Sequence, residues 1–544
     1  MSQQDKFPVS RRKFLGQLGT GAASAVALGA LSLPTLESVV EAAAVDPLTA
    51  NQRRETCFRT RKDAAQFEHH QPRVSHHTNG EEEHYAKKIA SYSKGLPHNS
   101  LGEVDLAAYD KFIAALTSGN PADFEAIPLG LGRKLTNPQS GLAFDLEGPD
   151  SHQLAIPPAP TITSALGGGE MVELYWMALT RDVHFSDYAT DSTIAAACAD
   201  LSALSNFRGP KSSGTVTPGT VFRGNTPGDL VGPYLSQFLW LDVPMGALLI
   251  PQKMNTVPAG VDYLTNFADW LAMQNGAAPP SYALDPTPRY IRNLRDIGEW
   301  VHVDALYQAY HQACLILLGM GAHFDKGNPY GSSATQIGFG TFGGPHILSL
   351  VTEVASRALK AVWYQKWFVH RRLRPEAFGG LVHNTRSGAA TYPVNAEVLH
   401  FAALDAVFSA HSSWLLPIAA PEGCPTHPSY GAGHATVAGA CVTILKAWFD
   451  EAFVISNPVV SNADGTNLEA YSGPNLTVGN ELNKLAANVA IGRNALGFHY
   501  RSDYWESLKL GEAVAIGVLQ ENKACYNEGG SFNLTKFDGT TITI

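Results

Sequence analysis

Cations and histidines gather in three short segments of the sequence, each in apolar surroundings. The segments are KWFVHRRLRPEAFGG (366–380), HPSYGAGHATVAGA (427–440) and GRNALGFHYRSDYW (492–505). A tetrahedral oxyanion is held well by several fixed donors, among which forked guanidiniums are strong and a helix N-terminus adds backbone N–H groups. One such segment alone is typical of a solvated face. Together they predict an anion pocket whose donors are Lys366, Arg374, Arg493 and the amides of Gly433 and His434.

The middle segment predicts a loop that ends at a helix N-terminus. Gly431 and Gly433 allow backbone conformations closed to other residues, and the apolar run ATVAGACVTILKAWF behind them is compatible with a helix. In the first segment, Pro375 is expected to end the helix that carries Lys366. A lone Gly-x-Gly-His sequence is more often a tight turn with a surface histidine than an anion site. The prediction of an anion site therefore depends on the other two segments as well.

The third segment pairs a histidine with an acid four residues later. Asp503 can hold one ring nitrogen of His499 and leave the other nitrogen free and more basic. A nitrogen prepared in this way acts as a nucleophile or as a metal ligand.

These segments resemble the three-part signature shared by vanadium-dependent haloperoxidases and phosphatidic-acid-phosphatase-type acid phosphatases. That signature consists of a lysine followed by Arg-Pro, then Pro-Ser-Gly-His, then Arg-x5-His-x3-Asp. The residues flanking these motifs are similar to those of bromoperoxidases of red algae and cyanobacteria, as are the segments GGGEMVELYWMALTRDVHF and WVHVDALYQAY. Those enzymes also place seven residues between the lysine and the arginine, as this sequence does. The resemblance covers roughly residues 160–520 and implies a large haloperoxidase-like helical bundle.

The resemblance also implies a vanadate cofactor, no haem, and a role for each matching residue. His499 would be the axial ligand of the ion, and His434 the acid–base group beside it. Its oxygens would be held by Lys366, Arg374, Arg493 and the Gly433 amide. Lys366 would polarise bound hydrogen peroxide for attack by halide, so that hypohalous acid leaves and halogenates small organic nucleophiles.

Two positions depart from the family pattern. Ala432 stands where the signature has serine, and Trp363 stands where algal bromoperoxidases carry an arginine. His427, seven residues before His434, matches the bromide-type branch. We therefore expect oxidation of bromide and iodide. The alternatives are an exported acid phosphatase, with His499 as phosphate acceptor, and a non-catalytic oxyanion-binding protein.

The elements that must position these residues are mainly helices. From residue 296 onward, apolar residues recur at three- and four-residue spacing, which predicts a helical bundle. Between 100 and 295, helical patterns alternate with long Pro/Gly loops, and only the final SFNLTKFDGTTITI is expected to be extended. We expect one mainly α domain over 101–544, with minor β structure and the active site within 345–510. Residues 45–100 are expected to form a polar, solvated arm. The alternative is that the histidines at 69, 70, 76 and 77 bind a metal ion.

Charge and the N-terminus bear on partners and location. A net charge of −10, with no basic block outside the first fifteen residues, gives no support for a nucleic-acid partner. Arg11 and Arg12 before a mildly apolar run resemble a twin-arginine signal, so residues 1–44 are expected to be cleaved and the product to be periplasmic or secreted, without a membrane anchor. The algal relatives imply a homo-oligomer, built from dimers and as large as a dodecamer.

The cysteines are too irregularly spaced to predict a zinc or iron–sulfur site. Six cysteines allow fifteen complete pairings, and the sequence selects no disulfide among Cys57, Cys198, Cys314, Cys424, Cys441 and Cys525.

Overall fold

The structure is a computed structural model that describes residues 46–544, so the export signal expected over 1–44 lies outside the described residues. The chain divides into two units, Met1–Phe58 and Arg59–Ile544. Of the first unit, residues 46–58 are described, and they hold the beginning of helix α2 (Ala50–His70). The second unit contains every candidate site residue.

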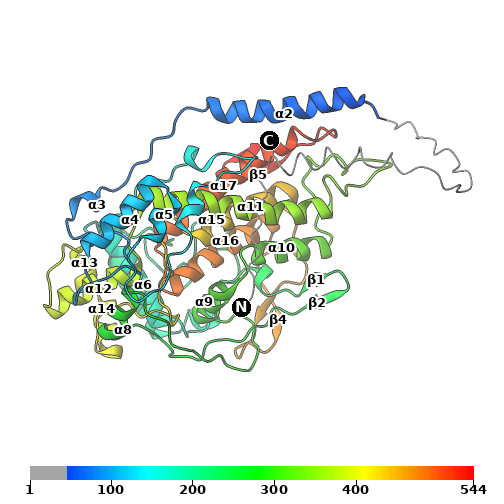
Figure 1. Cartoon of the computed structure of the whole chain (residues 1–544). Coiled ribbons are helices and arrows are strands. Elements are labelled where there is room, and N and C mark those ends of the chain that lie inside the picture. The colour runs from blue at the N-terminus through cyan, green and yellow to red at the C-terminus, as the bar shows by residue number, and fades with distance from the viewer. Residues whose placement is uncertain (1–45) are drawn as a thin grey trace, which may run out of the picture. The chain divides into compact units, whose positions relative to one another are not determined.

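The second unit is mainly helical, as predicted (Figure 1). After α2, the α-helices of the described chain are α3 (Glu81–His84), α4 (Leu106–Ser118), α5 (Pro121–Glu125), α6 (Ala165–Thr180), α7 (Ser192–Ala203), α8 (Phe267–Gln274), α9 (Leu294–Val303), α10 (Gln308–Gly319), α11 (Gly344–Tyr364), α12 (Pro375–Ser387), α13 (Ala396–His400), α14 (Ala402–His411), α15 (Gly433–Trp448), α16 (Val478–Ala495) and α17 (Arg501–Lys523). Short 3-10 helices at Pro138–Leu142, Ser151–Gln153, Phe185–Asp187 and Gln237–Leu239 interrupt the long loops.

The β structure consists of three short antiparallel hairpins. They are β1 (Val243–Met245) with β2 (Leu248–Ile250), β3 (Val459–Ser461) with β4 (Leu468–Ala470), and β5 (Asn533–Thr535) with β6 (Thr541–Thr543). The extended C-terminal segment is therefore confirmed. The other two hairpins were not predicted, because strands of three residues carry almost no periodicity.

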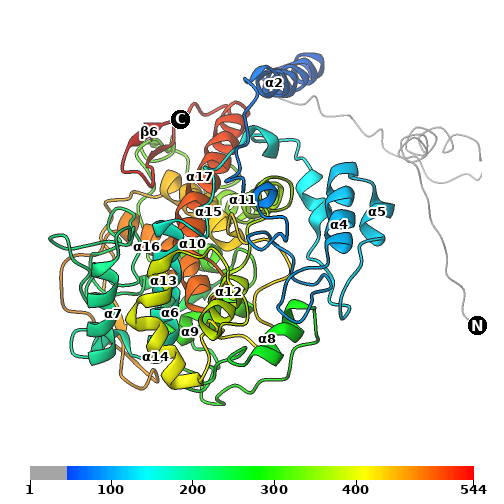
Figure 2. The same ribbon diagram turned by 90° about the vertical axis from the view of Figure 1, so that its left-hand side faces the viewer.

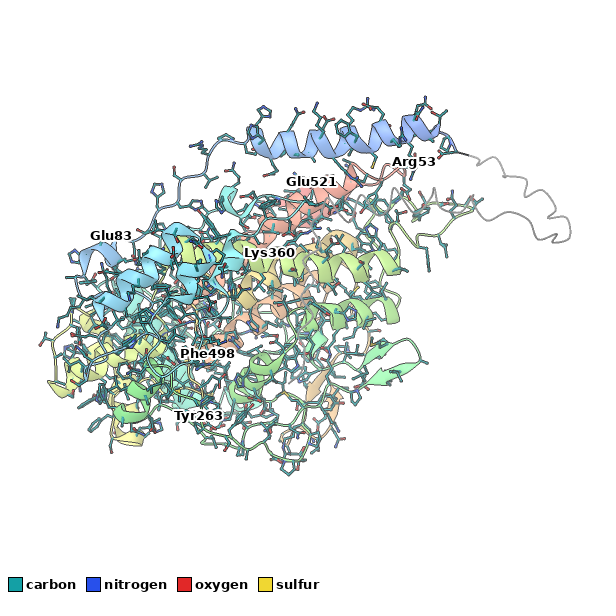
Figure 3. The ribbon with its side chains drawn as sticks, viewed as in Figure 1. Arg53, Glu83, Tyr263, Lys360, Phe498 and Glu521 are labelled. Atoms are coloured by element: carbon teal, nitrogen blue, oxygen red, sulfur yellow. The ribbon has the colours of Figure 1, made fainter. Side chains whose placement is uncertain are left out.

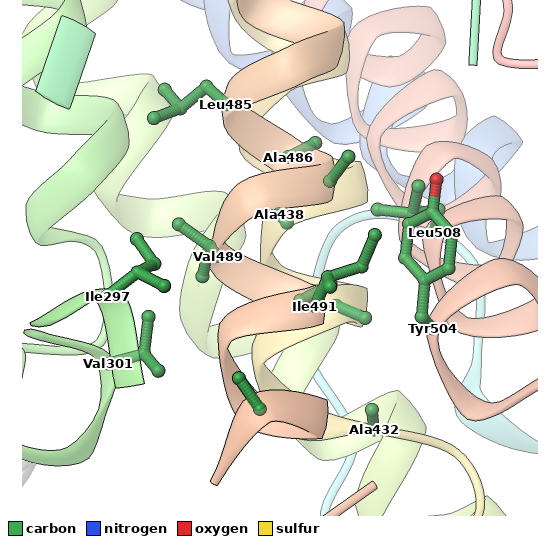
Figure 4. Packing of buried hydrophobic residues seen from close by; sticks show 14 of the residues in the cluster. Ile297, Val301, Ala432, Ala438, Leu485, Ala486, Val489, Ile491, Tyr504 and Leu508 are labelled. Atoms are coloured by element: carbon green, nitrogen blue, oxygen red, sulfur yellow. The ribbon is translucent and has the colours of Figure 1, made fainter. Parts of the chain in front are cut away.

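Helix α15 forms the centre of the bundle and packs against α11, α16 and α17. Its small residues allow this close approach: a side chain at Gly439 would overlap the backbone of Leu508, and one at Gly511 would overlap the backbone of Thr436. Figure 4 shows α16 between α9, which contributes Ile297 and Val301, and α17, which contributes Tyr504 and Leu508. Helix α15, which begins within the GAGH motif, is thus held by three neighbouring helices.

A second group of helices braces the site with buried carboxylates. Helix α6 contacts α7, α13 and α14, and Figure 2 shows these helices gathered on one side of the bundle. Its Glu173 accepts hydrogen bonds from the Arg501 guanidinium, including one of 2.9 Å from Nε, and its Glu170 forms a 3.0 Å ion pair with Arg372. The Glu173 pair ties α6 to the third motif, and the Glu170 pair ties it to the first.

Three local expectations need correction. The helix that carries Lys366 does not end at Pro375: α11 continues as a π-helix over Gln365–His370, and Pro375 is the first residue of α12, where its missing N–H costs nothing.

Neither Gly431 nor Gly433 has a positive φ. Space is limited at both positions instead: a Cβ would lie 2.5 Å from Ser507 Oγ at Gly431, and a tight 3.2 Å from Trp363 at Gly433.

Part of the segment expected to be a solvated arm is buried. Helix α2 has no buried residue, but Glu81, Tyr92, Lys94 and Leu96 are buried. The Lys94 ammonium forms a 2.6 Å ion pair with Glu376, so this part of the arm reaches the first turn of α12, next to Arg374.

Two further properties concern the described residues. Cys198, Cys314, Cys424 and Cys441 are buried thiols outside any disulfide. Among residues 46–544, no helix combines the length and hydrophobicity that crossing a membrane requires.

Candidate active site

The structure brings the three sequence segments together at the start of α15. Lys366 comes from the π-helical end of α11 and Arg374 from the residue just before α12. Arg493 lies in the last turn of α16, and His499 in the loop between α16 and α17. The side chains of all four residues are between 0 and 6 % exposed. A cluster of cationic and imidazole groups thus lies in the interior of the bundle.

Arg374 links the three segments. Its Nε donates to the carbonyl of His427 at 2.8 Å, and one terminal nitrogen donates to the ring of His427, also at 2.8 Å. The other terminal nitrogen donates to the Phe498 carbonyl at 2.8 Å and approaches His499 Nε2 at 3.0 Å. Phe498, labelled in Figure 3, is fully buried, and its ring lies 4.7 Å from the Arg493 guanidinium.

The positive charges of this cluster have no negative partner of their own. Lys366 Nζ donates only to the carbonyls of Pro428 and Ser429, at 2.8 and 2.9 Å. Arg493 donates one bond to the Val301 carbonyl, and its Nε is buried without a partner. Within the described chain, no carboxylate forms an ion pair with Lys366, Arg374 or Arg493. An uncompensated buried charge is costly, so the cluster favours an anion that supplies the missing charge.

The pKa values reflect this arrangement. Burial, reinforced by the charge of Arg374, holds the pKa of Lys366 well below its usual range. Burial lowers the pKa of the Arg493 guanidinium to about 10. An anion in the cluster would oppose both shifts, because an opposite charge favours the protonated form of each group.

A chain of hydrogen bonds fixes the protonation of His499. Its Nδ1 lies 2.9 Å from Asp503 Oδ2, and Asp503 Oδ1 accepts a 2.9 Å ion pair from Arg372. Burial and the nearby cations hold the pKa of His499 well below its usual range, so the ring is neutral. A neutral ring that donates from Nδ1 to a carboxylate carries its lone pair on Nε2, which faces the cationic cluster through Arg374. His499 is therefore prepared to act as a ligand or a nucleophile.

The N-terminus of α15 adds backbone donors. Ala432 occupies the N-cap position, where it has no side-chain oxygen to accept from the first turn. Its own N–H is already bonded to Ser507 Oγ at 2.7 Å. The N–H groups at the start of the helix, beginning with Gly433, lack intrahelical carbonyl partners by geometry and point toward negative charge. The predicted helix N-terminus is present, and its donors have no side-chain competitor at the cap.

Trp363 and His427 form one wall of the site. Their rings lie 4.7 Å apart, and the indole N–H donates to the Thr136 carbonyl at 3.1 Å. Lys366 Nζ lies 5.7 Å from the centre of the indole ring. The tryptophan thus covers the cluster with apolar surface at the position where the related enzymes were expected to carry a charge.

His434 differs from the other site residues because its side chain is 25 % exposed. Its Nε2 lies 2.9 Å from Asp304 Oδ1, and the Asp304 side chain is almost buried at the end of α9. This contact fixes the orientation of the imidazole ring. A histidine held in this way between a buried anion site and solvent is suited to proton transfer.

Sequence reasoning missed several residues that hold the predicted ones in place. They are Asp304, which bonds to His434; Ser429, which donates to Asp503; Arg372, which pairs with Asp503; and Ser507, which accepts from Ala432. Arg372 was visible inside the first segment and Asp304 inside WVHVDALYQAY, but neither residue type has a spacing that predicts its partner.

The fold and the site together define a helical-bundle enzyme that binds a tetrahedral oxyanion. The chain is 39% identical over 589 aligned residues to the vanadium-dependent bromoperoxidase of Corallina pilulifera, covering 90% of this chain and 98% of that protein. It is 36% identical to the vanadium-dependent bromoperoxidase of Ascophyllum nodosum, covering 92% and 94%. The chain belongs to the family of vanadium-dependent bromoperoxidases.

Two further comparisons agree with this assignment. Residues 347–528, which contain all three motifs, match the family described as the VCPO second helical-bundle domain. The fold is similar to that of the second vanadate-dependent bromoperoxidase of A. nodosum, a homohexameric structure, with a TM-score of 0.89 and 30% identity over 96% of this chain and 95% of that one. The resemblance expected from the motifs is therefore confirmed over nearly the whole length.

Proposed function

We propose that this enzyme binds vanadate in the cluster around His499 and uses hydrogen peroxide to oxidise bromide and iodide to hypohalous acid. The observation that carries the proposal is the set of three buried cations without a carboxylate partner, gathered beside a neutral histidine and an uncapped helix N-terminus. Tetrahedral vanadate fits this donor set, because it offers several anionic oxygens to charged donors and one metal position to a neutral nitrogen.

Each residue has a role in the proposal. Lys366, Arg374, Arg493 and the Gly433 amide hold the oxygens of the ion, and His499 Nε2 is its protein ligand. When bound, vanadate supplies a vanadium(V) centre that activates hydrogen peroxide as an electrophile toward halide. Asp503 keeps the His499 ring oriented and its lone pair on Nε2.

Proton transfer falls to His434 in this proposal. Its ring is both partly exposed and bonded to Asp304, so it can exchange protons between the buried site and solvent. Trp363 and His427 exclude water from the side of the cluster that they cover. The protein then needs to bind only small reactants at the ion, namely peroxide and halide.

The proposal is tested by reconstitution. Metal-free protein should not oxidise bromide with peroxide, orthovanadate should restore the activity, and phosphate should compete with vanadate because the same donors fit both tetrahedral anions. Full activity without vanadate would contradict the proposal. Phosphate ester hydrolysis without bromide oxidation would favour the phosphatase alternative, which the bromoperoxidase relatives do not support.

Export and assembly are part of the same proposal. Support for twin-arginine export comes from Arg11 and Arg12 and the small residues at 42–44. A homo-oligomer is supported by the homohexameric relative, and assembly from dimers up to a dodecamer is the larger form that we propose. Light scattering of the purified mature protein measures the subunit number directly.

A further inference from the structure

A pocket of about 440 Å³ borders the site at Asp304. His434 is the most exposed of the residues around the cluster, and its Nε2 is bonded to Asp304. Asp304 also forms part of the pocket wall, at the end of α9. Asp304 thus lies between the pocket and His434, the partly exposed residue of the site. Its volume lies within the range of small-molecule sites.

The pocket wall combines apolar side chains with polar ones. Its apolar part includes Ile250, Leu284, Trp300 and Val303. The β1–β2 hairpin, which contributes Ile250, carries the exposed side chains of Leu248 and Leu249 beside it on the same strand. Apolar surface therefore continues from the pocket onto the hairpin, and such continuous exposed surface indicates a binding site for an apolar molecule.

Two lining side chains have unused hydrogen-bond acceptors. The side-chain carbonyl oxygens of Gln252 and Gln312 are buried and accept no hydrogen bond within the described chain. The Gln252 amide nitrogen is already committed to the carbonyls of Phe238 and Leu241, at 2.8 and 2.7 Å, so its oxygen is fixed as the free end. A molecule that carries an O–H group would give these acceptors the donor that they lack.

The charges of the pocket favour a neutral molecule. Asp304 and Glu299 place two carboxylates in its wall, against the single cation Lys253. Glu299 already accepts from the Tyr282 hydroxyl at 3.0 Å and lies 3.2 Å from His302, so it is not free to bind a cation. An anionic ligand would be repelled by these carboxylates.

We propose that this pocket binds the organic acceptor of the halogenation step and that it selects neutral phenols. The inference rests on the proposed function for the source of the halogen. In the reaction, the electron pair of the ring forms a carbon–bromine bond with the bromine of hypobromous acid while the oxygen–bromine bond breaks. The ring then loses its proton, which combines with the departing hydroxide to give water.

Binding is measured on the vanadate-loaded full chain by saturation-transfer NMR, with phenol as the probe and no peroxide or halide present. We expect saturable binding that is weakened at least tenfold in Leu284→Trp, which fills the pocket. The matched control is Leu106→Trp, at an exposed leucine of α4 outside the pocket, which should bind phenol as the wild type does. Absence of saturable binding, or equal loss in both variants, would overturn the proposal.

A second variant tests the hydrogen bond and does not depend on the first. Anisole has the shape of phenol without the O–H donor, so the wild type should prefer phenol about tenfold. Gln312→Leu should remove this preference and leave anisole binding unchanged. An unchanged preference in Gln312→Leu would contradict the assignment of phenols. Because binding is measured without turnover, a wild type that binds phenol but fails to oxidise bromide contradicts the proposed function and not the pocket.

Turnover gives an independent readout of the same pocket. Phenol brominated by the wild type should give a ratio of ortho to para product that differs from the ratio given by reagent hypobromous acid. The ratio should move to the reagent value in Leu284→Trp. A wild-type ratio equal to that of the reagent would mean that halogenation occurs in solution, which contradicts the proposal.

Discussion

His434 Nε2 lies 2.9 Å from Asp304 Oδ1, and this contact joins the start of α15 to the end of α9 across 130 residues of chain. It connects the buried anion site to a carboxylate in the wall of the neighbouring pocket. If His434 transfers protons as proposed, that step involves a residue that the three motifs do not contain.

We expect Asp304→Asn to lower kcat for bromide oxidation about tenfold to a hundredfold, because an amide keeps a hydrogen bond to the His434 ring but removes the carboxylate that faces it during proton transfer. Vanadate affinity should change little. Steady-state kinetics and vanadate titration measure the two effects separately. The control is Asp405→Asn, at an exposed carboxylate of α14 paired with Arg386. A loss of vanadate binding equal to the loss of kcat would show that Asp304 supports the cage and not proton transfer.

The two motif histidines should separate binding from turnover. His499→Ala removes the neutral Nε2 ligand, so the variant should fail to retain vanadate after gel filtration. His434→Ala leaves the three cations and His499 in place, so it should retain vanadate and lose turnover. Vanadium content after desalting and the rate of bromide oxidation are the measurements. Normal rates in both variants would show that the assigned roles are wrong.

Halide preference depends on the wall formed by Trp363 and His427. We expect bromide and iodide to be oxidised and chloride to react weakly or not at all, on the basis of His427 and the family membership. Trp363 acts in the other direction, because an indole in place of an arginine makes the pocket beside Lys366 drier and favours a harder halide. Steady-state rates with chloride and bromide at equal peroxide decide the question. Chloride turnover that rivals bromide turnover would reverse the expectation.

Stability should depend on pH through His370. Burial lowers the pKa of His370 to about 3, below the ordinary value of 6.5. The stabilisation of the fold by its neutral ring is therefore complete above pH 6.5 and is lost as the pH falls toward 3. Its ring packs against Tyr430 at 4.8 Å, and phenylalanine would keep that contact without titrating. Relative to His370→Phe, the free energy of unfolding of the wild type should therefore fall by about 1.4 kcal/mol per pH unit between pH 6 and 4. Urea unfolding of both proteins at several pH values measures the difference, and a constant difference would contradict the expectation.

The sequence predicted the helices and the residues of the cationic cluster more fully than the contacts that hold those residues in place. Four cluster residues were predictable because they occur in pairs with fixed spacing. Lys366 and Arg374 share the first segment, and Arg493 and His499 share the third. Asp304 and Ser507 were not predictable, because each meets the site from an element distant in the chain. Such long-range contacts depend on how helices pack, and periodicity does not encode packing partners.

Local geometry was predictable only where one physical cause dominated. The glycines of GAGH were interpreted as positions of unusual φ, but their φ values are not positive and the close neighbours Ser507 and Trp363 favour a residue without a side chain. Pro375 was read as a helix end, although proline is equally suited to a first helical position. In both cases one residue type has two structural uses, and the surroundings select between them.

Ala432 is the departure that bears most directly on the cage, and its replacement by serine gives the last prediction. A serine hydroxyl at this N-cap position could accept from the first turn of α15 or donate to an oxygen of the ion. One neutral hydrogen bond contributes about 1 kcal/mol, against about 1.5–3 kcal/mol for each charge-assisted bond from Lys366, Arg374 and Arg493. We therefore expect the alanine enzyme to bind vanadate.

Ala432→Ser should tighten vanadate binding by no more than about tenfold, the equivalent of one hydrogen bond, with bromide still oxidised. If the hydroxyl caps the helix instead, the variant should unfold at a higher temperature with unchanged vanadate affinity, because an N-cap hydroxyl stabilises a helix by about 0.5–2 kcal/mol. Calorimetric titration with vanadate and thermal unfolding of both proteins separate the two cases. If the wild type fails to bind vanadate and only the serine variant binds it, the alanine marks a lost site and the proposed function is wrong.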